Sequence, residues 1–250
     1  MQFNFSLRNK GKNLNPIVLL HGWGGSLESL ETLASNLSEK IPNPIYNLEL
    51  AGFGTTPLSK NPMCTLDYGL FVKDFLEKEN LKLPILVGHS FGGKTIIQSM
   101  IKNLFAIKKV ILVNSSGIHP RNTTKKIISK TVADITPNFI KKNRTIKSLL
   151  YKYILRERDY LYAGELEDTF KIVVEEYFDE QIHNAFAKYD LKTLLIWSEK
   201  DVYTPLWMAK KLHRLIVNSK LQIVAKATHG LPLKEPKKVA DTISNWLYND

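Results

Sequence analysis

One segment is most informative about the architecture: Leu83-Pro84-Ile85-Leu86-Val87-Gly88-His89-Ser90-Phe91-Gly92-Gly93. An apolar run leads here into a Gly-x-Ser-x-Gly motif, and a helical pattern follows. We predict a strand over Leu83–Val87, a sharp turn at Ser90 and a helix over Phe91–Phe105, which is the setting of a nucleophilic serine. Gly88 and Gly92 are expected because the strand and helix backbones pass close to each other at such a turn.

The rest of the chain repeats this alternation of strand and helix. Short apolar runs typical of buried parallel strands lie at Ile17–Leu20, Ile45–Leu50, Val110–Val113, Leu194–Trp197 and Leu221–Ala225. Longer stretches with apolar residues three and four apart lie at Leu27–Lys40, Thr65–Leu81, Pro205–Val217 and Pro236–Tyr248. The alternation predicts an α/β fold, in which helices cover both faces of a mostly parallel sheet. Gln2–Leu7 is a candidate edge strand.

One long stretch interrupts the alternation. Residues 119–190 show a helical pattern with no clear strand, and they are too many for a simple crossover between neighbouring strands. Ligands of open α/β sheets bind beyond the carboxyl ends of the strands. We therefore predict a core of residues 1–118 and 191–250, with a helical lid inserted at 119–190.

A serine hydroxyl needs a base to take its proton and a third group to orient that base. After an elbow of this kind the chain order is serine, acid, histidine. Asp201 follows the predicted strand Leu194–Trp197, and His229 follows Leu221–Ala225, so both lie at carboxyl ends of strands. The sequence predicts Ser90, Asp201 and His229 as a catalytic triad.

Other acids and histidines are weaker candidates. Glu199 is the rival acid, but it lies closer to its strand and is expected to point away. Asp190 precedes its strand and is at the wrong end. Four further histidines are expected to have structural roles. His183 and His213 lie in helical patterns. His119 lies at the lid boundary, and His89 lies in the elbow, where it is expected to pack.

A glycine-rich loop follows the first predicted core strand, in Pro16-Ile17-Val18-Leu19-Leu20-His21-Gly22-Trp23-Gly24-Gly25. The backbone N–H groups of Trp23 and of Phe91, the residue after the serine, are candidates for an oxyanion hole. Each such donor typically contributes about 3 kcal/mol of transition-state stabilisation. The alternative is that the glycines form a plain turn.

Together these motifs resemble the α/β-hydrolase-fold serine hydrolases, and more closely the carboxylesterases. The residues that carry the resemblance are His21-Gly22-Trp23-Gly24, Gly88 to Gly93, Trp197 to Asp201 with Thr204-Pro205, and His229. The resemblance implies a mostly parallel eight-stranded sheet, a helical lid between strands six and seven, and acyl transfer to water without a cofactor. A serine at the nucleophile position separates the chain from dehalogenases and epoxide hydrolases of this fold, which carry aspartate there.

Two positions depart from the family pattern. The turn usually written Asp-x-Pro-Gly-x-Gly-x-Ser reads Glu49-Leu50-Ala51-Gly52-Phe53-Gly54-Thr55-Thr56 here, and Thr228 replaces the glycine often found before the histidine. Neither departure touches the proposed proton-transfer groups, so they bear on the subfamily.

Composition narrows the class of protein. With 44% hydrophobic and 24% charged residues, the chain is neither disordered nor a disulfide scaffold. Cys64 is the single cysteine and cannot form an internal disulfide. The first residues lack a signal-peptide pattern, and no apolar run is long enough to span a membrane. We expect a soluble, cytoplasmic protein without a metal site.

Charge is unevenly distributed over the predicted lid. The chain carries a net charge of +11, and residues 121–158 hold eleven basic and two acidic side chains, whereas 159–190 hold nine acidic and two basic ones. The acidic half argues against a nucleic-acid partner. His21-Gly22-Trp23-Gly24 and Ala225-Lys226-Ala227-Thr228-His229 also resemble the methyl ester esterase that acts on pimeloyl-acyl-carrier protein in biotin synthesis. That resemblance implies that basic lid residues dock the acidic carrier. Six residues are the candidates for such docking, or else form a solvated face: Lys125, Lys126, Lys130, Lys141, Lys142 and Arg144.

The sequence thus predicts hydrolysis of a small-molecule ester with a small or medium apolar acyl group. Aromatic residues of the lid either line the acyl pocket or pack lid helices together: Phe139, Tyr151, Tyr153, Tyr160, Tyr162, Phe170, Tyr177, Phe178 and Phe186. Two alternatives are a methyl ester esterase for carrier-bound acyl chains and a ligand receptor on a hydrolase scaffold. Thioesters, amides and carbon–carbon bonds are further possible substrates of the same triad.

Overall fold

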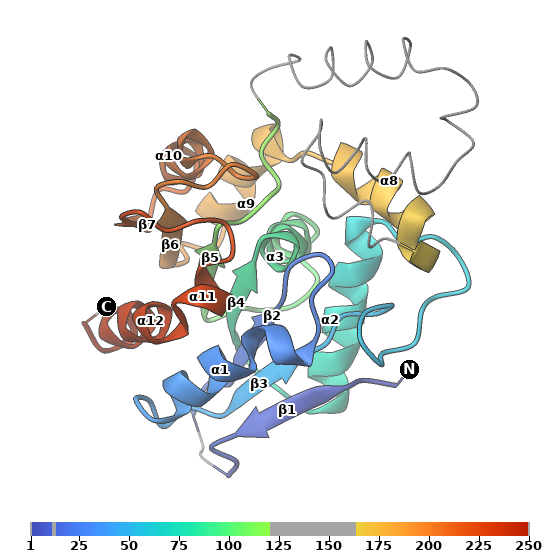
Figure 1. The fold of residues 1–250 in the computed structure, drawn as a ribbon, viewed down its shortest axis with the longest axis horizontal. Coiled ribbons are helices and arrows are strands. Elements are labelled where there is room, and N and C mark those ends of the chain that lie inside the picture. The colour runs from blue at the N-terminus through green and yellow to red at the C-terminus, as the bar shows by residue number, and fades with distance from the viewer. Residues whose placement is uncertain (1, 12–13, 121–163, 250) are drawn as a thin grey trace.

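The computed structural model describes residues 2–11, 14–120 and 164–249, which contain one seven-stranded sheet (Figure 1). Its strands lie in the order β1-β3-β2-β4-β5-β6-β7. β1 pairs antiparallel with β3, and every other neighbouring pair is parallel. The strands span Phe5–Arg8 (β1), Ile17–Leu20 (β2), Ile45–Leu48 (β3), Ile85–His89 (β4), Lys109–Val113 (β5), Thr193–Ser198 (β6) and Ser219–Val224 (β7).

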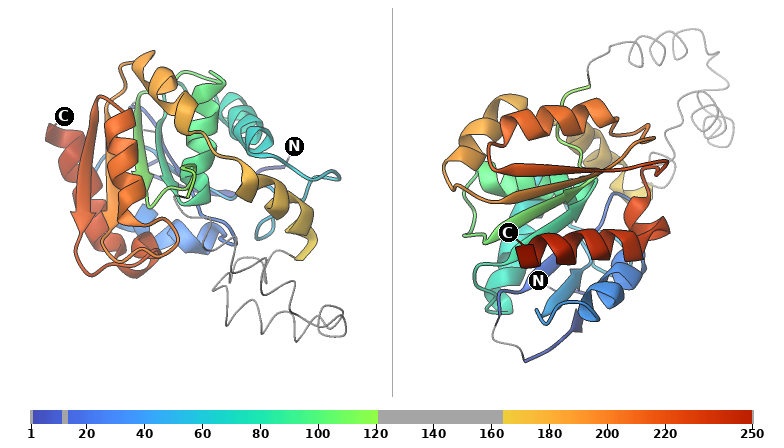
Figure 2. Two further views of the ribbon diagram at one scale, coloured as in Figure 1. Left: turned by 90° about the horizontal axis from the view of Figure 1, so that it is seen from above. Right: turned by 90° about the vertical axis from the view of Figure 1, so that its left-hand side faces the viewer.

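Helices cover both faces of the sheet, as predicted (Figures 1 and 2). α1, α11 and α12 lie on one face, and α2, α3, α9 and α10 lie on the other. The core helices span Leu27–Ser38 (α1), Thr65–Lys78 (α2), Phe91–Ile101 (α3), Leu206–Leu215 (α10), Leu231–Lys234 (α11) and Pro236–Asn249 (α12). The described end of the insertion adds η2 (Gly164–Leu166), α8 (Glu167–Glu175) and α9 (Asp179–Ala187). None of the helices within the described ranges combines the length and apolar character needed to cross a bilayer.

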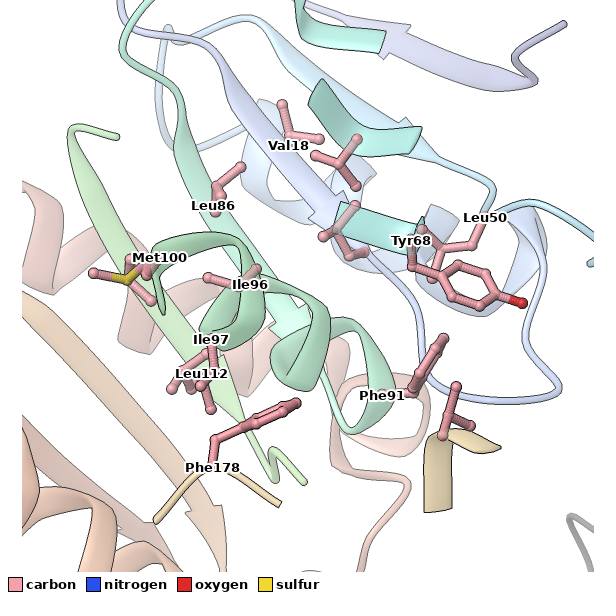
Figure 3. Close-up of a cluster of buried hydrophobic side chains, with 14 of the residues drawn as sticks. Val18, Leu50, Tyr68, Leu86, Phe91, Ile96, Ile97, Met100, Leu112 and Phe178 are labelled. Atoms are coloured by element: carbon pink, nitrogen blue, oxygen red, sulfur yellow. The ribbon is translucent and has the colours of Figure 1, made fainter. Parts of the chain in front are cut away.

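Alternate residues of the central strands β2, β4, β5 and β6 supply two separate hydrophobic cores. Ile17 and Leu19 of β2 pack with α1 and α12, whereas Val18 and Leu20 face α2 and α3. Figure 3 shows the second core, where the labelled strand residues Leu86 and Leu112 lie beside helix α3 and Val18 lies farther from it. Because both faces of the strands are buried, their sequences read as continuous apolar runs.

The prediction of an eight-stranded sheet is wrong for the described residues, which contain seven strands. The apolar patterns themselves predicted six strands and an edge strand, and the eighth came only from the family resemblance. Residues 2–4, which precede β1, are not in a strand. The ring of Phe3 instead packs on α2, with its centroid 4.9 Å from that of Phe71 and 5.5 Å from that of Phe75. β1 is therefore the edge of the sheet.

The described part of the insertion is fastened to the core. It lies between β5 and β6, one strand earlier than expected, because the sheet has one strand fewer before it. The Met63 amide donates to Thr169 Oγ1 (3.0 Å) and the Thr65 amide to Glu176 Oε2 (2.9 Å). The amide of Phe178 donates to the Gly117 carbonyl (2.9 Å). α8 and α9 are thus held against α2 and the end of β5.

Candidate active site

The predicted strand–turn–helix arrangement around Ser90 is confirmed. Ser90 lies between β4 and α3 with φ 50° and ψ −108°, a region that residues with a side chain rarely occupy. A Cβ atom on Gly88 would lie 2.5 Å from the Gly93 nitrogen, and one on Gly92 would collide with the Leu20 carbonyl. Glycine is therefore required where the helix backbone approaches β4 and β2.

The three residues predicted as a triad lie within hydrogen-bonding distance of one another, in the order serine, histidine, aspartate. Ser90 Oγ is 3.0 Å from His229 Nε2, and His229 Nδ1 is 2.8 Å from Asp201 Oδ2. The Asp201 side chain is fully buried, whereas that of His229 is 19% exposed. The second carboxylate oxygen, Oδ1, accepts hydrogen bonds from the amides of Tyr203 (2.8 Å) and Thr204 (2.9 Å). The carboxylate is thus held with one oxygen toward the imidazole.

The rival acids lie elsewhere. Glu199 is exposed, and its Oε2 accepts a hydrogen bond from the Lys226 amide at 2.8 Å. Asp190 contacts Asn218 at the opposite end of β6. Both observations agree with the sequence interpretation that these carboxylates point away from the serine.

The loop after β2 lies against the elbow. A Cβ atom on Gly22 would be 3.3 Å from Ser90 Cβ. Among the described residues, the amides of Trp23 and Phe91 donate no hydrogen bond to a protein acceptor. Both N–H groups belong to segments beside the serine, as the predicted oxyanion hole requires, and the hole itself stays a prediction.

His21 stabilises this loop, a role that its position before Gly22 did not reveal. The ring is completely buried. Nδ1 donates to the Gly22 carbonyl at 2.8 Å, and Nε2 accepts from the Leu50 amide at 3.0 Å. Because Nε2 accepts a hydrogen bond, the ring is neutral with its proton on Nδ1, and burial lowers the pKa of His21 in the same sense.

Aromatic rings gather next to the serine. The Trp23 ring centroid lies 5.0 Å from that of Phe53, 5.2 Å from Phe91 and 5.1 Å from Phe170 of α8. Phe178 and Phe186 are instead buried in the core beneath the insertion, and Figure 3 shows Phe178 beside α3. Of the lid aromatics, Phe170 thus borders the site, whereas Phe178 and Phe186 pack.

Several predicted residues lie outside the described ranges. They include the six candidates for carrier docking, namely Lys125, Lys126, Lys130, Lys141, Lys142 and Arg144, and five of the lid aromatics, Phe139, Tyr151, Tyr153, Tyr160 and Tyr162. Docking of an acidic carrier and the limits of the lid, residues 119–190, remain predictions.

Lys94, one turn after Ser90, is a buried lysine that sequence reasoning missed. Its side chain is almost inaccessible and Nζ donates to the Val173 carbonyl in the last turn of α8. Nζ also lies 5.5 Å from the ring of Tyr177 and 5.7 Å from that of Phe178. Lys94 therefore joins the elbow helix to the insertion. Burial lowers its pKa to about 8, against the opposing effect of Glu176.

We expect the Lys94→Met variant to lack part of the pH dependence of stability. Between pH 8 and the unfolded pKa of about 10.4 the unfolded chain holds more protons, so Lys94 makes the wild type more stable as pH rises. The contribution is about 3 kcal/mol at most. Urea unfolding measures the free energy of unfolding at pH 7 and at pH 10. This free energy should increase more from pH 7 to pH 10 in the wild type and in the exposed control Lys210→Met than in Lys94→Met. Equal gains in all three proteins would contradict this assignment.

Comparisons with known proteins agree with this architecture. Residues 17–242 match the model of the alpha/beta hydrolase family. The uncharacterized hydrolase YugF of Bacillus subtilis is 26% identical over 92% of this chain and 89% of its own length. The putative esterase/lipase 2 of Mycoplasma genitalium is 24% identical over 95% and 91%. The structure of an esterase from Exiguobacterium antarcticum superposes with a TM-score of 0.75 at 16% identity, covering 99% of this chain and 94% of that one.

Proposed function

The chain belongs to the alpha/beta hydrolase family, and on this premise we propose that it is a serine esterase. It cleaves carboxylic esters with small or medium apolar acyl groups, with Ser90 as nucleophile, His229 as base and Asp201 as orienting acid. The proposal rests on the two successive contacts of His229, 3.0 Å to Ser90 Oγ and 2.8 Å to Asp201 Oδ2. The names of two similar proteins, an esterase/lipase and an esterase, support the reaction class.

Acylation begins with attack of Ser90 Oγ on the ester carbonyl carbon. His229 Nε2 takes the hydroxyl proton as the bond forms, and buried Asp201 stabilises the resulting imidazolium. The negative charge moves to the former carbonyl oxygen, where the amides of Trp23 and Phe91 donate to it. When the tetrahedral adduct collapses, the imidazolium gives its proton to the leaving alkoxide, and an alcohol departs from the acyl-enzyme.

Deacylation repeats these steps with water. His229 removes a proton from a water molecule that attacks the acyl carbonyl carbon, and the same two amides bind the second oxyanion. Collapse breaks the bond to Ser90 Oγ, which recovers the proton from His229. The products are a carboxylic acid and an alcohol, and the enzyme returns to its starting state. Apart from the ester and water, every group that takes part in these steps belongs to the chain.

The aromatic rings around the serine favour an apolar acyl group. The rings of Phe53, Phe91 and Phe170, from the loop after β3, the elbow and α8, all pack against Trp23 in the loop after β2. Phe53 and Phe91 are buried, whereas Trp23 and Phe170 are partly exposed and would provide the apolar surface for the acyl group. Burying a methylene group on such a surface contributes about 0.8 kcal/mol. The surface would not compensate a charged or sugar acyl group for lost hydration.

The test is hydrolysis of p-nitrophenyl esters with acyl chains from acetyl to palmitoyl. We expect kcat/KM to rise with the first added methylenes, by up to about fourfold for each, and to fall once the chain exceeds the pocket. A fluorophosphonate probe, which reacts with activated serines, should add one label to the wild type, located on Ser90 by peptide mass analysis. A wild type that hydrolyses no ester and takes up no label is not an esterase of this mechanism.

A further inference from the structure

Two side chains hold the backbone carbonyl of His229. Nε2 of His89 and Nδ2 of Asn114 each donate to this oxygen at 2.9 Å. His89 ends β4 directly before Ser90, and Asn114 follows β5. We propose that His89 and Asn114 are positioning residues that fix the main chain of His229 and, through it, the contact of the imidazole with Ser90. The inference rests on the proposed function.

His89 is built to donate without acting as a base. It is only 8% exposed, and its ring centroid lies 5.1 Å from that of His229. Burial, with the neighbouring His229, lowers the pKa of His89 to about 3, so the ring stays neutral when the enzyme works. Nε2 faces a carbonyl oxygen and therefore carries the proton. Nδ1 lies beside the loop after β2, where a Cβ atom on Gly22 would be 2.9 Å away.

Asn114 connects the end of β6, which leads into the loop of Asp201, with the loop that carries His229. It is completely buried at φ 45°, a conformation that asparagine tolerates better than most residues. Its Oδ1 accepts from the Ser198 amide (2.8 Å), and Nδ2 also donates to Ser198 Oγ (2.9 Å). That hydroxyl donates to the Thr228 carbonyl (2.8 Å), while Thr204 Oγ1 lies 3.1 Å from the Asn114 carbonyl. All polar atoms of the side chain are paired.

The arrangement matters because His229 lies in a loop between β7 and α11. A loop has no ladder of its own hydrogen bonds to fix it, yet a displacement of about 1 Å between reacting groups can cost about 100-fold in rate. Neither His89 nor Asn114 is among the groups proposed to touch the ester. Loss of either should therefore lower kcat and leave KM nearly unchanged.

The experiment compares His89→Leu, which removes the donor, with His89→Gln, whose side-chain amide can still reach the carbonyl. Ser99→Ala is the control, since it deletes a buried hydrogen bond to the Thr95 carbonyl (2.8 Å) inside α3. With a p-nitrophenyl ester we expect kcat to fall about 100-fold in His89→Leu, with KM within about threefold of the wild type. His89→Gln should recover at least about a tenth of the wild-type kcat, a loss of no more than 1.4 kcal/mol, and Ser99→Ala should resemble the wild type. The rate of fluorophosphonate labelling should follow kcat.

The outcomes separate this inference from the proposed function. Equal kcat values for His89→Leu and Ser99→Ala would overturn it, and so would equal losses in the leucine and glutamine variants. If His89→Leu does not fold, Asn114→Asp decides. That variant keeps the acceptor for Ser198 but loses the donor to His229, so its kcat should fall while KM holds. An unlabelled, inactive wild type would instead refute the proposed function.

Discussion

Replacing Ser90 with alanine is expected to lower kcat for p-nitrophenyl esters by about 10⁶-fold. The variant keeps Cβ and loses only Oγ, which is 3.0 Å from His229 Nε2. Without this oxygen no acyl-enzyme can form, and the remaining rate comes from bound water near the imidazole. Steady-state hydrolysis at high enzyme concentration measures the residual kcat, and fluorophosphonate labelling should disappear.

The control for this prediction is Ser99→Ala, a second serine of the elbow helix that lies away from the site. It should retain kcat and the label. A Ser90→Ala protein that keeps more than about 1% of wild-type kcat, a loss of under 3 kcal/mol in the activation barrier, would show that another residue is the nucleophile.

Replacing Asp201 with asparagine should lower kcat by about 10⁴-fold. The amides of Tyr203 and Thr204 hold Oδ1, so the new amide group takes the place of Oδ2, opposite His229 Nδ1. An N–H group there forces Nδ1 to accept, and the proton moves to Nε2, which can then no longer take the serine proton. The measurement is the ester assay, with KM expected to change little.

Glu199→Gln is the matched control, because it makes the same chemical change on the rival acid. Glu199 Oε2 accepts a hydrogen bond from the Lys226 amide and not from His229. The kcat of the Glu199→Gln variant should therefore stay at the wild-type level. The opposite pattern, with a large loss in Glu199→Gln and little in Asp201→Asn, would assign the acid to Glu199.

The parallel core could be predicted because both faces of its strands are buried. β2 agrees with the predicted Ile17–Leu20 at both ends. β7 begins two residues before the predicted Leu221, because this edge strand is half exposed and opens with the polar Ser219 and Lys220. α2 and α3 end earlier than their apolar patterns, where Asn80 and Asn103 adopt positive φ. Such chain reversals leave a weak signal, since apolar residues continue beyond them.

The three triad residues could be predicted from the motif and the chain order, whereas the residues that hold their main chain in place could not. Ser90 stands in a recognisable turn, and Asp201 and His229 follow apolar strands. Asn114 also follows one, but its partners Ser198 and His229 are 84 and 115 positions away. Nothing local in a sequence records a hydrogen bond over such a separation, so residues that act through another residue's backbone appear only in the folded structure.

The left-handed backbone conformation of Ser90 also implies a conflict between conformational stability and catalytic activity. At φ 50° a residue with a side chain is strained, by an amount of order 1–3 kcal/mol, whereas glycine is at ease. Glycine would thus make the elbow more stable while removing the only atom that performs the attack. The elbow is therefore a point at which selection for heat resistance alone would lead away from the working enzyme.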